Sequence, residues 1–287
     1  MSKKTHQQQL AQRKAKRQAE RDAERRRQRR NLAITVTAVA AVVAVVIGVF
    51  VVVGVGGDDT PAAAPSDLPS SAGPDNKPKS IPTALAAPLK RPTALPAEAS
   101  CTYKKSTEPA SKPVKAPADG KTKASGTSKV SLNTSIGDLQ LTLDSALAPC
   151  TVKNFLSLVG QKFYDNTKCH RMTVGEGLQV LQCGDPTGTG GGGPGYSFAD
   201  EVYPTLKYGR GVLAMANSGP NTNGSQFFIV YGDASGLGPQ YTAFGTIDES
   251  GLKLIDKVAE AGVTPQNGPT DGPPITPVDI KTATTAA

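Results

Sequence analysis

The sequence predicts a mostly β protein, with a closed antiparallel β-barrel capped by two α-helices, preceded by a single transmembrane helix and a Pro/Ala-rich linker. Three observations support this fold class. Residues 129–284 contain many short alternating segments and two segments with helical spacing. Twelve of the fourteen aromatic side chains follow residue 150, which places the expected core in the C-terminal half. Residues 31–57 contain no charged side chain. The expected parts are a basic cytoplasmic tail (1–30), a transmembrane helix (31–57), a linker (58–128) and a globular domain (129–284).

The uncharged segment is long enough to cross a membrane as a helix. Its 24 residues from Leu32 to Val55 would measure about 36 Å as a helix, against a hydrocarbon core of about 30 Å. A buried core helix is disfavoured because soluble helices keep a polar face. A cleaved signal peptide is disfavoured because its apolar part is usually about 7–15 residues long. We therefore expect residues 31–57 to be an uncleaved signal anchor in the cell membrane.

Charge is concentrated before this anchor. Residues 1–30 carry 12 Lys/Arg against 3 Asp/Glu, whereas residues 31–287 carry 20 against 21. The basic excess favours a cytoplasmic N-terminus and an extracytoplasmic domain in a single-pass arrangement. The tail could also bind anionic lipid as a helix, but a solvated topology signal is the preferred interpretation. Because the remainder is nearly neutral, no nucleic-acid partner is expected.

Residues 58–128 have the composition of a linker. They hold 12 of the 23 Pro and one aromatic side chain, so they bury too little apolar surface to offset chain entropy. Pro-rich chain tends to extend, and residues 58–100 are expected to form a disordered stalk. If Cys101 forms a disulfide, the segment after it is docked on the domain instead.

Four cysteines in an oxidising compartment predict two disulfides. They are Cys101, Cys150, Cys169 and Cys183, and the sequence leaves the three possible pairings open. The competing interpretation is a zinc site made of three cysteines and His170. It is disfavoured because the chain has no CxxC pair, so no metal site is expected.

The elements of the domain follow in order from Lys129. Two alternating segments around a turn at 136–138 predict a β-hairpin. Apolar spacing from Pro149 to Gly160 predicts a helix, and a second helix is expected over 250–262. The remaining strands are expected at 168–174, 178–183, 211–217, 225–232, 242–248 and 274–284.

Common catalytic motifs are absent from this domain. The glycine-rich segment 188–195 lacks the pattern of a phosphate-binding loop and is interpreted as a flexible surface loop. The domain has no GxSxG motif, and a Ser-His-Asp hydrolase would need His170, its only histidine, as the base. A packed strand residue is the more ordinary role for this histidine.

Residues 215–229, with the sequence MANSGPNTNGSQFFI, resemble the signature of the cyclophilin family of peptidyl-prolyl cis-trans isomerases. Supporting matches are IGDLQLTL, PCTVKNFLSL, QCGD and FGTI, and together they cover about residues 129–284. The resemblance implies an eight-stranded barrel and a rotamase activity that assists protein folding without a cofactor. It also implies unfolded or proline-containing polypeptides as partners and a monomeric domain. With its anchor and cysteines, the chain looks like a membrane-anchored, actinobacterial-like bacterial form.

The resemblance also implies the residues of the site. Arg171 matches the catalytic arginine, Gln182 the glutamine that helps to hold it, and Phe228 a wall of the proline pocket. The backbone edge on which substrate docks matches Ala216 and Asn217. The other substrate-binding positions are Val180, Leu237, Tyr241, Phe244 and Leu178. A fixed guanidinium can stabilise a twisted X-Pro bond, so these residue types suit the chemistry.

The chain departs from the family pattern at two places. Residues 172–181 form a hairpin about three residues longer than in many cyclophilins and lack its Phe, so Leu178 is expected to take part of that role. Gly236 stands where several members carry a Trp that donates to cyclosporin, so cyclosporin binding is expected to be weak. The alternative function is a catalytically weak proline-peptide-binding or chaperone module of the same fold, tethered at the cell surface.

Overall fold

The computed structural model describes residues 76–285. The predicted basic tail, the predicted transmembrane helix and the linker up to residue 75 lie outside the described residues. In the described part of the chain, no helix has the length and apolar character needed to span a bilayer.

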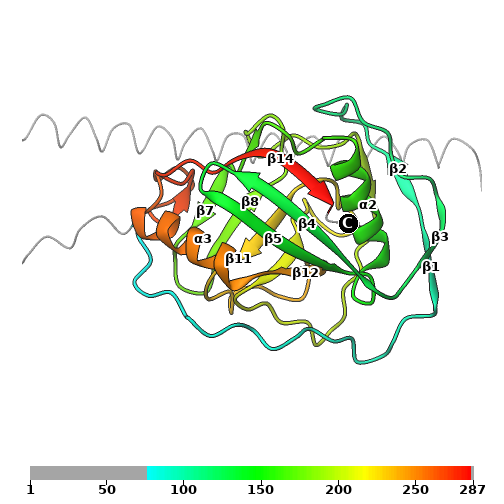
Figure 1. Ribbon diagram of the computed structural model, residues 1–287, viewed down its shortest axis with the longest axis horizontal. Coiled ribbons are helices and arrows are strands. Elements are labelled where there is room, and N and C mark those ends of the chain that lie inside the picture. Colours follow the sequence, from blue (N-terminus) through cyan, green and yellow to red (C-terminus); the bar gives the residue numbers. More distant parts are fainter. Residues whose placement is uncertain (1–75, 286–287) are drawn as a thin grey trace, which may run out of the picture. The chain divides into compact units, whose positions relative to one another are not determined.

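An antiparallel sheet of ten strands forms the framework of the described residues (Figure 1). From one edge to the other, the strands are β13 (Asp271–Gly272), β7 (Arg171–Thr173), β8 (Val180–Cys183), β11 (Phe227–Val230), β10 (Val212–Met215), β12 (Ala243–Ile247), β5 (Gly137–Asp144), β4 (Thr127–Thr134), β14 (Asp279–Thr285) and β6 (Thr167–Lys168).

The sheet curls into a half-barrel, which corrects the prediction of a closed eight-stranded barrel. Within residues 76–285, the edge strands β13 and β6 do not pair with each other. The strand expected over 168–174 is interrupted at Cys169 and His170, so that β6 pairs with β14, whereas β7 pairs with β8 and β13. The covalent chain between β6 and β7 therefore connects the two ends of the sheet, and Arg171 lies where β7 begins.

The predicted hairpin and both predicted helices are confirmed. β4 and β5 pair from Thr127↔Asp144 to Thr134↔Gly137, so the turn is slightly earlier than expected. Helix α2 (Pro149–Gly160) begins with Pro. An N–H at the first helical position has no acceptor within the helix, so Pro loses no hydrogen bond there. Helix α3 (Glu249–Ala261) begins after Asp248, whose side chain accepts a hydrogen bond from a backbone N–H of the first turn.

Apolar side chains lie on both faces of the sheet. The inner core contains Phe155, Tyr164, Phe227 and Phe244 among others, and both helices contribute to it. A second group, here called the outer cluster, is formed by Val180, Tyr203, Leu206, Tyr208, Val212, Ala214, Phe228, Val230, Ala234 and Ala243. Successive side chains of a strand point to opposite faces. Phe227 therefore belongs to the inner core and Phe228 to the outer cluster.

Residues 76–128, here called the extension, lie against the domain. β1 (Glu98–Cys101) pairs with β3 (Gly120–Lys123) beside α2, and β2 (Tyr103–Lys105) pairs with β9 (Tyr196–Phe198) (Figure 1). The segment before β1 is also bound, because the Ala86 N–H donates to the Arg210 carbonyl at 2.9 Å. The described part of the predicted linker is thus folded onto the domain.

The cysteines form two disulfides, Cys101–Cys150 and Cys169–Cys183. This is one of the three pairings that the sequence left open. The first joins the extension to α2, and the second joins the chain before β7 to the end of β8. Because all four sulfurs are bonded to each other in pairs, none is a free thiolate for the zinc site considered from the sequence.

Candidate active site

Strand register places three predicted catalytic residues in one row. β7 pairs Arg171 with Gln182 of β8, and β8 pairs Gln182 with Phe228 of β11. Residues directly opposite each other on antiparallel strands point to the same face, and neighbouring strands lie about 4.8 Å apart. Since Phe228 faces the outer cluster, Arg171 and Gln182 share that face and point away from the inner core.

The Arg171 guanidinium is held on two sides. Its Nε and Nη2 donate to the two carboxylate oxygens of Asp271 at 2.8 and 2.7 Å, and its Nη1 donates to Oε1 of Gln182 at 3.0 Å. A guanidinium has five N–H donors, so two remain for another molecule. The Arg171 side chain is 33% exposed, which leaves it open to a bound chain.

The pairing also fixes the charges of both partners. Hydrogen bonds from Arg171 hold the pKa of Asp271 below its ordinary value, although partial burial opposes this shift. Hydrogen bonds to Asp271 raise the pKa of Arg171 in turn. Both directions favour the ionised forms, so the guanidinium is a permanent and oriented cation at the surface of the sheet.

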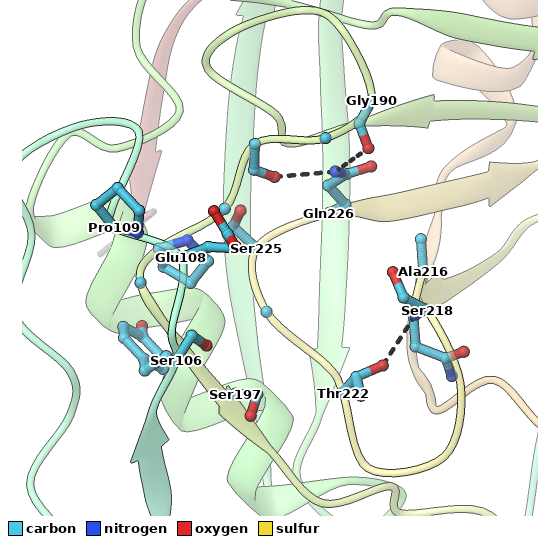
Figure 2. A pocket seen from close by; sticks show the side chains of 18 of the residues that line it. Ser106, Glu108, Pro109, Gly190, Ser197, Ala216, Ser218, Thr222, Ser225 and Gln226 are labelled. Carbon is cyan, nitrogen blue, oxygen red and sulfur yellow. Dashed lines mark hydrogen bonds between the residues drawn. The ribbon is translucent and has the colours of Figure 1, made fainter. Parts of the chain in front are cut away.

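A chain of amide side chains continues from Gln182 to the glycine-rich loop. Nε2 of Gln182 donates to Oε1 of Gln226 at 2.9 Å. Nε2 of Gln226 donates in turn to the carbonyl oxygens of Gly190 and Gly192 at 2.8 and 2.9 Å (Figure 2). The loop at 188–195 was expected to be a flexible surface loop. It instead anchors the side chains that hold Arg171.

Most predicted substrate-binding residues lie together on the outer face. Val180 belongs to the outer cluster with Phe228, and Tyr241 packs edge-on against the Phe228 ring with centroids 5.5 Å apart. The other predicted residues that pack against this cluster are Leu178, Ala216 and Leu237. An apolar patch therefore lies beside the guanidinium.

Phe244 lies elsewhere. Its side chain is fully buried in the inner core, where its ring centroid is 5.3 Å from that of Phe155. Its neighbour in β12, Ala243, faces the outer cluster instead. The alternation of side chains along a strand explains this placement. The structure thus does not bring Phe244 to the patch with Phe228.

The predicted docking edge follows β10. The Ala216 N–H donates to the Gln226 carbonyl at 3.0 Å. The Asn217 side chain donates to the Gln240 carbonyl at 3.1 Å. Both residues line a groove with Gln182 and Gln226, which places this edge next to the residues that hold Arg171.

The long hairpin at 172–181 is locked to a neighbouring loop. Gln179 is buried, and its side chain accepts from the Asp233 N–H at 2.7 Å and donates to the Ser80 carbonyl at 2.8 Å. The Gly236 N–H donates to the Gly177 carbonyl at 2.9 Å. A Cβ on Gly236 would meet that oxygen at 2.9 Å, so the two loops approach too closely for a larger residue there.

Gln226 and Asp271 were not predicted from the sequence as site residues. Gln226 is inside the 215–229 segment and two residues before Phe228, so strand alternation could have placed it on the same face. Asp271 follows Arg171 by 100 residues and lies in a two-residue strand. No local pattern links it to the arginine.

Comparison with known proteins points to one family. The family model described as cyclophilin type peptidyl-prolyl cis-trans isomerase/CLD matches residues 129–285. A probable peptidyl-prolyl cis-trans isomerase B of Mycobacterium leprae is 51% identical over 195 residues, which cover 63% of this chain and 65% of the relative. Its namesake in Mycobacterium tuberculosis (strain H37Rv) is 50% identical over 196 residues, which cover 63% of this chain and 62% of the relative. The chain thus spans less than two thirds of the length of these relatives.

A solved structure shows the same fold. The crystal structure of a cyclophilin type peptidyl-prolyl cis-trans isomerase from Cryptosporidium parvum superposes with a TM-score of 0.50 at 37% sequence identity. The match covers 56% of this chain and 99% of that one.

Proposed function

Because the chain belongs to the family of cyclophilin type peptidyl-prolyl cis-trans isomerases, we propose that it accelerates rotation about X-Pro bonds in unfolded or proline-containing polypeptides and so assists their folding. One observation carries the proposal. Arg171 is fixed by Gln182 and Asp271 on the sheet face that also carries Phe228. The proposed reaction uses no cofactor.

The chemistry follows from the electronic structure of the amide. Resonance gives rotation about a peptide bond a barrier of about 18–20 kcal/mol. Twisting the bond returns a lone pair to the proline nitrogen. A donor fixed beside that nitrogen stabilises the twisted form more than the planar one, and this difference lowers the barrier. Arg171 can supply such a donor, because two of its five N–H groups are not used by Asp271 and Gln182.

The remaining residues take supporting roles in this proposal. The apolar patch of Val180, Leu178, Leu237, Tyr241 and Phe228 holds the proline ring while the chain on one side turns. The edge at Ala216 and Asn217 docks the substrate backbone. Phe244 has no direct role, since it lies in the inner core.

We further propose that the protein is a membrane-anchored, actinobacterial-like form whose domain is extracytoplasmic and monomeric. The uncharged run at 31–57, the basic tail before it and the two disulfides support this arrangement. Membrane fractionation followed by protease treatment of intact cells tests it. Digestion of the domain in intact cells is expected, and protection of the domain would contradict the proposal.

Cyclosporin is proposed to bind weakly, because Gly236 offers no side-chain donor. A titration that gave a nanomolar dissociation constant would contradict this proposal.

The main experiment compares the full-length chain with Arg171→Ala and Arg171→Lys. Loss of one preorganised donor typically costs about 10²- to 10³-fold in rate, and we expect a fall of this size in kcat/KM for an X-Pro peptide. Lys is expected to rescue little, because it cannot form the two-pronged contact with Asp271. Circular dichroism checks that the fold is retained. Equal rates would remove Arg171 from the mechanism.

The same experiment tests the alternative function. The longer hairpin at 172–181 is the observation that favours a binding module, because it changes one wall of the patch. A parent protein that binds the peptide without accelerating isomerisation would support that alternative and contradict the enzymatic proposal.

A further inference from the structure

A groove of about 530 Å³ opens beside the proposed catalytic residues. Its lining includes Gln182, Gln226, Ala216 and Asn217 of the domain and residues 106–109 of the extension. Figure 2 shows Glu108 and Pro109 across the groove from Ala216 and Ser218. The wall at 106–109 lies outside residues 129–285, which match the family model. It is therefore a feature of this chain's extension.

This wall is fixed by hydrogen bonds on both sides of Glu108. Before it, the Ser106 N–H donates to the Gly195 carbonyl at 3.0 Å. After it, the Ser111 N–H donates to the Gly193 carbonyl at 2.8 Å, and the Gly193 N–H donates to the Ser111 hydroxyl at 3.0 Å. The four residues between Ser106 and Ser111 are thus held in place along the groove, and they include most of this wall.

Further contacts hold the wall to the domain. The Cys101–Cys150 disulfide lies at the start of this segment, and β2 pairs with β9 directly before it. Gly195 has φ of +78°, and a Cβ there would lie 2.7 Å from the Ala110 nitrogen. Only glycine lets the loop and the extension approach this closely without displacement. The wall is therefore a fixed part of the groove.

Glu108 gives the groove its charge. Among the described residues that line the groove, it is the only charged one, and the others are mainly Gly, Ser, Thr, Asn and Gln. The Glu108 side chain is exposed, and within residues 76–285 it forms no ion pair. A carboxylate in this position favours an approaching cation and disfavours an anion.

An extended substrate bound at Arg171 would reach this wall on one side of its proline if it follows the groove. Gln182 both contacts Arg171 and lines the groove, and extended chain advances about 3.3 Å per residue. We propose that Glu108 is a specificity-determining residue that selects polypeptides with a Lys or Arg side chain within a few residues of the proline. This inference rests on the proposed isomerase function.

The test uses the full-length chain and a set of Ala-Pro peptides. In each peptide one Lys replaces Ala at one of four positions before or after the proline, and a neutral peptide serves as reference. Both kcat/KM and the dissociation constant are measured for the parent, Glu108→Gln and Glu260→Gln. Glu260 is exposed on α3 and does not line the groove, so its variant changes the net charge equally.

Exposed ion pairs contribute little, so the parent is expected to prefer Lys peptides by about two- to five-fold, on one side of the proline only. Glu108→Gln should abolish this preference, Glu260→Gln should keep it, and about 0.5 M salt should weaken it. Equal preference in the parent and Glu108→Gln, or equal loss in both variants, would overturn the inference. If no peptide is isomerised, the proposed function fails, and the ratio of dissociation constants still decides the role of Glu108.

Discussion

Asp271 determines how Arg171 can present its donors. The carboxylate occupies the Nε–Nη2 edge of the guanidinium with two short hydrogen bonds, and Gln182 takes one donor of Nη1. Two-pronged pairs fix orientation as well as charge. Asp271 is therefore a positioning residue, because it acts on a substrate through Arg171 and does not need to touch it.

We expect Asp271→Asn to lower kcat about tenfold, because hydrogen bonds between charged groups stabilise by about 1.5–3 kcal/mol and this pair is partly exposed. KM should change less, since the donor acts mainly on the twisted bond. Asp279→Asn is the matched control, because Asp279 is an exposed carboxylate in β14 outside the groove. An unchanged kcat in Asp271→Asn would contradict the positioning role.

The same pair gives activity a predictable acid limit. Hydrogen bonds from Arg171 lower the pKa of Asp271 in the folded protein. Because this pKa is lowered, the Arg171–Asp271 pair stabilises the folded site fully above the pKa of Asp271 in the unfolded chain, about 3.9. The stabilisation is lost as the pH falls through the pKa of Asp271 in the folded protein. Because Asp271 stays ionised from neutral pH down to about pH 4, activity should be constant over this range with respect to its protonation, and it should fall at lower pH. Asp271→Asn should lack this acid limb, and an identical limb in both proteins would exclude Asp271 as its source.

At the residue scale, the sequence was informative where the residues were contiguous. The 215–229 segment and the QCGD match around Gln182 allowed the proposed site residues to be named from a resemblance, and strand register then placed three of them in a row. Phe244 could not be assigned from its sequence neighbours, because one step along β12 separates the outer cluster from the inner core.

At the scale of elements, a disulfide braces the two strands that carry the site. Cys169 lies two residues before Arg171, and Cys183 directly follows Gln182. These strands are short, since β7 has 3 residues and β8 has 4. A covalent link next to this short pair of strands limits how far Arg171 and Gln182 can separate.

We expect the double variant Cys169→Ser/Cys183→Ser to lose about 2–4 kcal/mol of unfolding free energy, the usual range for removal of a disulfide. Its kcat should also fall, because Arg171 and Gln182 are less constrained. Denaturant unfolding and peptide kinetics measure the two effects. The comparison variant is Cys101→Ser/Cys150→Ser, which removes the bridge farther from Arg171 in sequence. Equal losses of kcat on a neutral peptide in both variants would contradict a specific brace.

The elements themselves were predictable to different degrees. The β4–β5 hairpin and both helices follow from periodicity and from Pro149, because these signals are local. β1, β2 and β3 were not predicted, because their segment has the composition of a linker and its strands are stabilised by partners distant in sequence. For example, Tyr103 of β2 packs edge-on against Tyr196 at 5.9 Å and Phe198 at 5.5 Å.

At the scale of the whole molecule, the extension completes the fold of the family-matched region. Arg91 donates to the carbonyls of Leu147 and Glu201 at 2.8 and 2.7 Å. Asn76 and Val263 exchange two hydrogen bonds at the end of α3. The extension therefore contacts the domain at widely separated places.

The anchor and the orientation across a membrane stay predictions, because the residues concerned lie outside those described.

A truncation series tests whether the domain needs the extension. One chain begins at Asn76 and the other at Gly126, and both carry Cys150→Ser, with Cys101→Ser in the longer one, so that the disulfide does not contribute. Burial of one large side chain such as Tyr103 stabilises by about 1.5–3 kcal/mol, and Tyr103 is buried in the intact protein. We therefore expect the shorter chain to be less stable by about 2 kcal/mol or more in denaturant unfolding. Removal of β2 also leaves the β9 edge unpaired, so the shorter chain should aggregate more readily. Equal unfolding midpoints in the two chains would show that the extension rests on the domain without stabilising it.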